Sequence, residues 1–269
     1  MTEAQRDTMS KVPALTLGFW IVKVLATTLG ETGGDTVSMT MDLGYLVGTA
    51  IFLSVLVVLV WAQIAAKRFN AWLYWATIIA STTAGTTMAD FATRSMGIGY
   101  PGGSLLLLAC VLGSLGVWRY AMGSVSVDTV REPRAELFYW VTITFSQTLG
   151  TALGDWAAED RTGTALRDWM AGGGLGYAGG AIAFGLALAV LAGLYYSTRI
   201  SRVALFWMAF ILTRPLAATV GDLFDKPHAK GGLEISRPIA SLILAVAVIV
   251  LILVLPQRAG RHPGAEAKA

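Results

Sequence analysis

The chain has 269 residues, of which 55% are hydrophobic and only 14% are charged. Soluble domains are about 45–50% apolar and about 25% charged, so this composition indicates a polytopic membrane protein and excludes a disordered chain. The chain has one cysteine, which excludes a disulfide scaffold, and two histidines, which leave few ligands for haem or zinc. The net charge is +3, but the lysines and arginines are scattered and form no nucleic-acid-binding patch.

Four uncharged apolar stretches are each long enough to cross a hydrocarbon core about 30 Å thick. They are residues 44–63, 99–118, 175–197 and 238–256. Four further apolar stretches alternate with them and are richer in Thr, Ser and Gly. These are residues 13–35, 69–90, 136–155 and 203–222. The sequence therefore predicts an all-α membrane protein with eight transmembrane helices joined by short loops.

A unit of two helices is repeated four times along the chain. In each copy a tryptophan precedes an aspartate by 15 residues. The four segments read WIVKVLATTLGETGGD, WATIIASTTAGTTMAD, WVTITFSQTLGTALGD and WMAFILTRPLAATVGD. We place the repeats at about residues 13–66, 69–120, 136–198 and 203–256. They make up one transmembrane domain, residues 1–257, and a short polar cytoplasmic tail follows at residues 258–269.

Four tandem two-helix units, each with a Trp and a Gly-Asp ending, resemble a bacterial membrane-protein family built of a repeat of unknown function. The segment LATTLGETGGD of the first unit is the most specific part, and the resemblance covers about residues 13–257. It implies a protein of the bacterial inner membrane with two spans per repeat. It supplies no established activity, so a function has to be inferred from the chemistry of the residues.

Because each repeat has two spans, all four repeats are expected to enter the membrane in the same direction, as parallel repeats about an axis along the membrane normal. The odd-numbered helices hold nearly all the intramembrane polarity, so we expect them inside and the even-numbered helices outside, facing lipid. Small residues one and five positions before each aspartate let the inner helices approach closely. The tryptophans are expected in an aromatic belt at the cytoplasmic interface. Lys and Arg are more numerous on the side that holds both termini, which predicts that both are cytoplasmic.

The polar residues of the odd-numbered helices define a candidate path for an ion or substrate. The repeated aspartates either converge as a ring or a pair of pairs, or each ends its helix in solvent. A polar stripe on the same helical face either lines a pathway or bonds back to its own helix. The aspartates are Asp35, Asp90, Asp155 and Asp222, and the stripe holds Glu31, Thr28, Thr83, Thr148 and Gln147.

Two basic residues stand inside spans without repeat equivalents, Lys23 and Arg214. Intramembrane charges are costly, so they mark either function or a buried ion pair. Arg214 is expected to pair with Glu31 or with an aspartate of a neighbouring repeat, or else to bind or gate. The charges of the 5–6 loop (residues 156–173) and the 7–8 loop, which includes Lys226 and His228, are interpreted as solvated.

The leading hypothesis is an inner-membrane cation transporter. Oxygen ligands without paired histidines favour a hard divalent ion such as Mn²⁺ or Mg²⁺, or proton-coupled traffic, with Glu31 and Asp35 as the candidate metal ligands. The alternatives are a proton-coupled carrier of small organic anions, held by Lys23 and Arg214, and a non-transporting sensor or scaffold. No nucleotide-binding or hydrolase motif is present, so no enzyme activity and no cofactor other than a bound cation is expected. The expected partners are the lipid bilayer, a small ion or solute and, in a homo-oligomer, further copies of the chain, but no nucleic acid.

Overall fold

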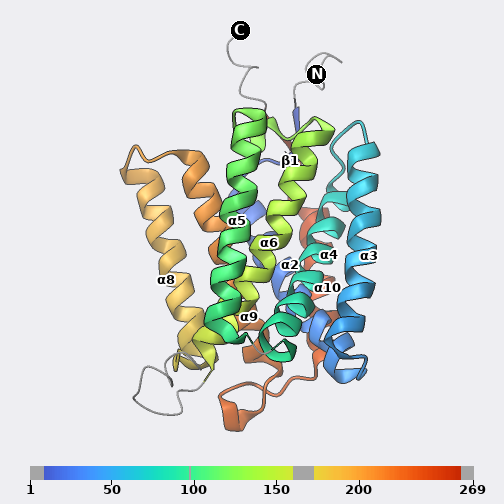
Figure 1. Ribbon diagram of the computed structural model, residues 1–269, viewed down its shortest axis with the longest axis vertical. Coiled ribbons are helices and arrows are strands. Elements are labelled where there is room, and N and C mark those ends of the chain that lie inside the picture. The colour runs from blue at the N-terminus through green and yellow to red at the C-terminus, as the bar shows by residue number, and fades with distance from the viewer. Residues whose placement is uncertain (1–8, 97, 160–172, 262–269) are drawn as a thin grey trace, which may run out of the picture.

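A computed structural model describes residues 9–96, 98–159 and 173–261. Within these residues the chain forms eight α-helices, which agree with the eight predicted spans to within about one turn at each end (Figure 1). The helices are α2 (Leu17–Asp35), α3 (Gly44–Ala65), α4 (Ala71–Asp90), α5 (Gly99–Met122), α6 (Pro133–Ala158), α8 (Gly176–Ser197), α9 (Arg202–Asp225) and α10 (Arg237–Val254).

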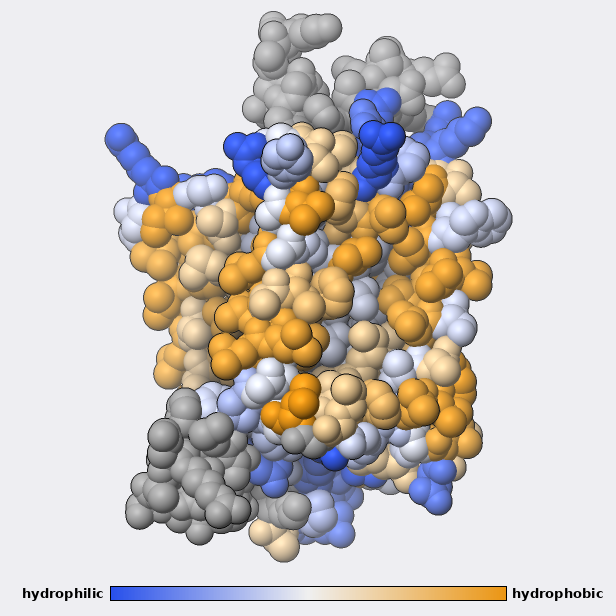
Figure 2. Space-filling view, viewed as in Figure 1, coloured by the Kyte–Doolittle hydropathy of each residue, from blue (hydrophilic) through white to orange (hydrophobic). Residues whose placement is uncertain are grey.

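Five of these helices are long and apolar enough to cross a membrane: α3, α5, α8, α9 and α10. Helices α2, α4 and α6 have similar lengths but carry more Thr, Ser and Gly. The face drawn in Figure 2 has an apolar band between two polar ends. The chain therefore has the build of a multi-pass membrane protein.

Helices α2, α4, α6 and α9 contain most of the buried residues. Each packs against the next in chain order, and α9 packs against α2, so the four helices form a closed ring. Helices α3, α5, α8 and α10 bury only a few residues each. We call these two groups the inner helices and the outer helices.

The outer helices pack across the repeat boundaries. Helix α3 lies on α4, α5 on α6 and α8 on α9, and α10 closes the arrangement by lying on α2. The two helices of one repeat touch each other much less. A repeat is therefore not a packed hairpin, because each outer helix covers the inner helix of the following repeat.

The turns between the inner and outer helices require a backbone that favours glycine. After α2 and α4 the chain continues in π-helical turns, Thr36–Thr40 and Phe91–Ser95. Helices α3, α5 and α8 then begin at Gly44, Gly99 and Gly176, which have φ of 74°, 66° and 65°. A glycine tolerates this left-handed conformation at no steric cost. A Gly-Tyr pair therefore starts each of these outer helices.

The two chain ends are joined by a short antiparallel pair of strands that the sequence did not predict. Strand β1 (Met9–Pro13) pairs with β2 (Ala259–Arg261), so the first span begins at Leu17 rather than at Pro13, and residues 259–261 are not a free tail. Residues 262–269 of the predicted tail lie outside the described residues. Lys11 of β1 forms an ion pair of 2.5 Å with the buried Glu136 of α6, which fixes this strand to the bundle.

The aromatic starts of the inner helices form a buried cluster. Trp75, Trp140 and Trp207 are at most 4% exposed, and the hydroxyls of Tyr74 and Tyr139 lie 2.6 Å apart. The expectation that the repeated tryptophans form an interfacial belt is therefore wrong for these three. They pack inside the ring because the inner helices are covered by the outer ones. The bundle is closed by aromatic side chains at this end.

A buried polar column in the inner helices

One buried ridge of each inner helix carries the residues that face the neighbouring inner helices. It consists of the aspartate and the residues 4, 8, 12 and 16 positions before it, which lie on one side of a helix over about 24 Å. All of these residues are buried. From the aromatic end, the layers are Phe19, Tyr74, Tyr139 and Phe206; Lys23, Ile78, Ile143 and Phe210; Thr27, Thr82, Gln147 and Arg214; Glu31, Thr86, Thr151 and Ala218; and Asp35, Asp90, Asp155 and Asp222. We call the last of these the carboxylate layer.

Glycines bring these ridges into contact. A Cβ atom added at Gly30 of α2 would lie 2.1 Å from Cγ2 of Thr82, and one at Gly150 of α6 would lie 2.4 Å from Cβ of Arg214. A Cβ at Gly221 of α9 would lie 3.0 Å from Cβ of Glu31. The predicted small-residue spacing therefore serves close helix packing, and it does so around the whole ring.

The Arg214 guanidinium crosses between helices to meet an acid. Its Nη2 donates to Oε2 of Glu31 and to Oγ1 of Thr86, both at 2.6 Å, and Thr86 donates to the same Glu31 oxygen at 3.2 Å. Helices α9, α2 and α4 are thus joined by one buried network. This is the pairing with Glu31 that the sequence left open.

In the carboxylate layer, the aspartates form two pairs, each bridged by a base. Arg94 contacts Asp90 at 3.1 Å and Asp155 at 3.0 Å, and Lys226 contacts Asp222 at 2.7 Å and Asp35 at 3.1 Å. Burial alone lowers the pKa of Lys226, but the carboxylates of Asp222 and Asp35 raise it above its usual value, so this ammonium is charged at neutral pH. Two interhelical ion-pair bridges therefore close this end of the bundle.

The bridging bases reduce the fourfold sequence repeat to a twofold charge pattern. Arg94 and Lys226 stand four residues after the aspartates of the second and fourth repeats. The first and third repeats have Met39 and Glu159 at this position. Each base reaches its own aspartate, one helical turn away, and the aspartate of the next inner helix.

Acids outnumber bases at this end of the column. Asp225 pairs with Arg237 and lies 3.8 Å from Lys226, so within the described residues the bases Arg94, Lys226 and Arg237 serve five aspartates. Two groups of acids bring their oxygens within 4.8 Å of one another. They are Glu31, Asp155 and Asp222, and Asp35, Asp222 and Asp225. The candidate metal ligands Glu31 and Asp35 therefore fall into different groups.

The middle of the column contains buried polar atoms, most of them donors, that lack partners within the described part of the chain. Nε and Nη1 of Arg214, and both amide atoms of Gln147, have no hydrogen bond there. Lys23 is fully buried, donates only a 3.4 Å bond to Thr213 and lies 4.0 Å from the ring centroid of Phe210, with no described carboxylate in ion-pair range. The hydroxyls of Thr82, Thr142 and Ser146 are also unpartnered. Leaving such groups unsatisfied is costly, so the site is suited to a polar ligand.

The threonine stripe is satisfied by its own helices. Thr28, Thr83 and Thr148 each donate to the carbonyl oxygen four residues earlier, at 2.7–3.0 Å. Of the two interpretations of this stripe, the contacts favour self-satisfied helices.

The loop charges differ from the prediction of solvated groups. The Lys226 side chain is only 14% exposed and Asp225 pairs with Arg237, whereas the His228 side chain is 71% exposed and lies 3.9 Å from Glu234. In the 5–6 loop, residues 160–172 lie outside the described residues. The functional residues that sequence reasoning missed are thus Arg94 and Lys226, whose spacing of four from an aspartate was the available signal.

The fold and this column define a class: helical proteins of multi-pass membrane build, made of four repeats around a buried polar centre. The chain matches the family described as "Repeat of Unknown Function (DUF347)" over residues 18–69, 73–124, 138–201 and 205–259. The chain belongs to this family. No curated protein and no solved structure matches it.

Proposed function

We propose that the protein is a membrane carrier for a small monovalent organic anion, such as a short carboxylate, and that it couples the anion to a proton. The observation that carries this proposal is the set of unpartnered buried donors. Lys23 and Arg214 are two buried basic groups, and Glu31 is the one acid in ion-pair contact with them, so the middle of the column offers more basic groups than acids among the described residues. An anion of one charge would accept bonds from Arg214, Lys23 and Gln147, and a proton taken up with it would leave the total charge of the column unchanged.

The polar column is closed at both of its ends, which supports a carrier rather than an open channel. The aromatic layer covers one end of the column, and the Arg94 and Lys226 bridges cover the other. A carrier exposes a central site to one side at a time, which requires such a closure on each side. We place the inner helices around the path as parallel repeats and the outer helices against lipid. From the family resemblance we further propose the bacterial inner membrane, and from the distribution of Lys and Arg we propose that both termini are cytoplasmic.

The carboxylates would supply the proton coupling. A substrate carboxylate that binds Arg214 competes with Glu31 for the same guanidinium. Glu31 would then be a buried ion without a partner, and taking up one proton removes that cost. The excess of aspartates over bases in the carboxylate layer provides further groups that exchange protons on the way to the membrane surface.

The cation hypothesis is favoured by one feature, the group formed by Glu31, Asp155 and Asp222. Each of these acids already has a base within ion-pair distance, namely Arg214, Arg94 and Lys226. A divalent cation would have to displace all three bases, so we prefer the anion. A sensor or scaffold would share the ion pairs, but the unpartnered donors would then cost stability without serving a purpose.

Substituting Lys23 with glutamine tests the site. We expect proteoliposomes with an inward proton gradient to accumulate labelled two- to four-carbon monocarboxylates, and K23Q to slow this uptake roughly 10- to 100-fold, since one charge-assisted hydrogen bond to the anion is lost. The matched control is Lys67→Gln, at an exposed position. Equal melting temperatures of the two variants show that the loss is not due to unfolding. Undiminished uptake in K23Q would contradict the anion site, and uptake of Mn²⁺ or Mg²⁺ that stops in E31Q and D35N would support the cation hypothesis instead.

Substituting Glu31 with glutamine tests the coupling. Glutamine cannot bind the proton that we assign to Glu31, so E31Q is expected to exchange labelled carboxylate across the membrane but to lose accumulation driven by the pH gradient. The measurement compares counterflow exchange with net uptake in the same vesicles. An E31Q variant that still accumulates carboxylate tenfold or more in response to a tenfold proton gradient would contradict this role.

A further inference from the structure

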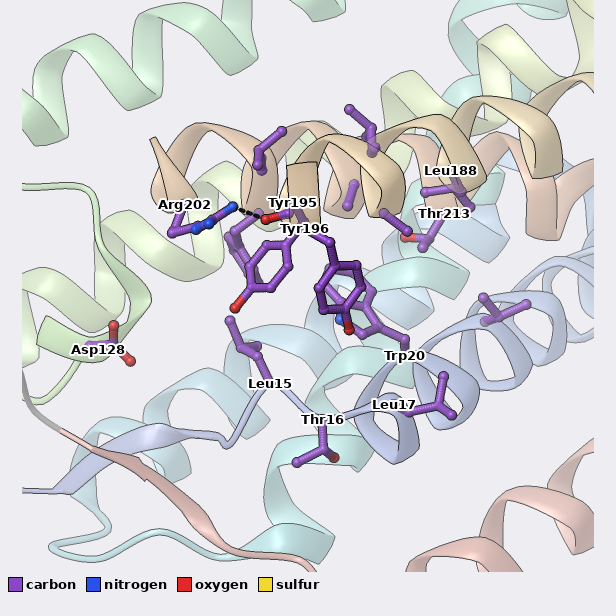
Figure 3. A pocket seen from close by; sticks show the side chains of 16 residues that line it. Leu15, Thr16, Leu17, Trp20, Asp128, Leu188, Tyr195, Tyr196, Arg202 and Thr213 are labelled. Carbon is purple, nitrogen blue, oxygen red and sulfur yellow. Dashed lines mark hydrogen bonds between the residues drawn. The ribbon is translucent and has the colours of Figure 1, made fainter. Parts of the chain in front are cut away.

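A pocket of about 580 Å³ opens beside the ring, between α2, α8 and α9 (Figure 3). Its body is apolar and includes Leu17 and Val24 of α2 and Leu188 and Leu191 of α8. Leu188 and Tyr195 lie seven residues apart on α8, which corresponds to about 10 Å along the helix. We call this pocket the lateral groove.

The lateral groove is polar at one end only. Among the described residues that line it, Asp128 and Arg202 are the charged ones, and Figure 3 draws both at the end away from Leu188 and Thr213. Within the described residues, neither has an ion-pair partner of opposite charge. Arg202 donates to the carbonyl oxygen of Tyr195 and lies 4.2 Å from the centroid of that tyrosine ring. The groove thus offers one cation and one anion beside an apolar channel.

This end of the groove has the features of a membrane interface. Arg202 starts α9 and Asp128 precedes α6, on the side of the protein that holds both chain ends. Trp20, Tyr195 and Tyr196 line the groove. Amphipathic aromatic side chains of this kind are enriched at the level of the lipid headgroups.

We propose that the lateral groove binds one zwitterionic phospholipid with a primary ammonium headgroup, that is, phosphatidylethanolamine. Its phosphate would pair with Arg202, its ammonium with Asp128, and one acyl chain would fill the apolar part. A headgroup with one charge of each sign matches the two unpaired groups, whereas a purely anionic lipid would leave Asp128 facing negative charge. The proposed lipid binding does not depend on whether the chain transports an anion.

The lipid would also contact the polar column. Thr213 lines the inner end of the groove and accepts the hydrogen bond from Lys23. An acyl chain in the groove would therefore pack against the residue that holds Lys23. Lipid binding would in this way fix the position of α9 relative to α2.

Native mass spectrometry of the protein released from nanodiscs that contain equal amounts of phosphatidylethanolamine and phosphatidylglycerol tests the proposal. The wild type is expected to retain phosphatidylethanolamine in preference to phosphatidylglycerol. D128N should reduce this preference, and R202Q should reduce retention of the same lipid, each roughly two- to fivefold, the range of an exposed ion pair. Leu188→Trp, which fills the apolar part, should lower retention of both lipids.

The matched control is Arg199→Gln, at an exposed arginine outside the groove. It should retain lipid as the wild type does. The proposal is overturned if the wild type shows no preference, or if D128N and R202Q behave like R199Q. A preference for phosphatidylglycerol that disappears in R202Q would overturn it too, since the groove would then take an anionic lipid.

Discussion

Replacing Arg214 with glutamine is expected to lower the free energy of unfolding by about 3–5 kcal/mol, because it leaves the Glu31 carboxylate as a buried charge without its partner. The 2.6 Å contact between Nη2 and Oε2 lies in a part of the bundle where Arg214 is fully buried. The Glu31 side chain is only 4% exposed, so little water is available to compensate for the loss. The measurement is the melting transition of the purified protein in detergent.

The double variant R214Q/E31Q distinguishes loss of this pair from general damage to the core. Removing both charges together should recover most of the stability, because neither partner is then left as an isolated ion. Arg119→Gln on the exposed face of α5 is the control and should change the stability by less than about 0.5 kcal/mol. A double variant as unstable as R214Q would show that the two side chains do not act as a pair.

Substituting Gly30 with alanine is expected to destabilise the protein by about 1–3 kcal/mol, since the new methyl group would overlap the Thr82 side chain and push α2 and α4 apart. Alanine normally favours a helix over glycine by about 0.5–1 kcal/mol, so a loss of stability has to come from packing. Thermal unfolding in detergent measures it.

The outer helix α5 offers a matched control. A Cβ atom added at Gly113 meets no atom within 4 Å, so Gly113→Ala should leave the stability equal or raise it. Combining Gly30→Ala with Thr82→Ala should recover part of the loss, because the overlapping methyl group of Thr82 is removed. If Gly30→Ala and Gly113→Ala have the same melting temperature, α2 and α4 do not approach each other closely at Gly30.

The sequence predicted the helices well and their partners poorly. Hydropathy and the Trp-to-Asp repeat located the spans, since both signals are local. Nothing local indicates that α3 lies on α4, or that the strand at Met9–Pro13 pairs with residues near the other chain end. Those contacts join segments of different repeats, and a repetitive sequence offers several equivalent partners for each.

The sequence predicted most of the residues of the candidate site but not which of them form ion pairs. Glu31 and Arg214 stood out because a charge inside a span is costly, and the structure brings them together. Lys226 was assigned to a loop and Arg94 was not assigned to the site, because both follow the predicted end of a span. Their long side chains reach back to carboxylates within the bundle, so a residue outside a span can still complete a site inside it.

The packing of each outer helix on the inner helix of the following repeat has a consequence for biosynthesis. Helix α2 leaves the ribosome before the other described helices, yet the helix that covers it, α10, follows all of them. The seam between α2 and α10 therefore stays open until all four repeats have been translated. A truncated product lacking its final repeat would keep that seam bare, with the face of α2 exposed to any neighbouring helix in the bilayer.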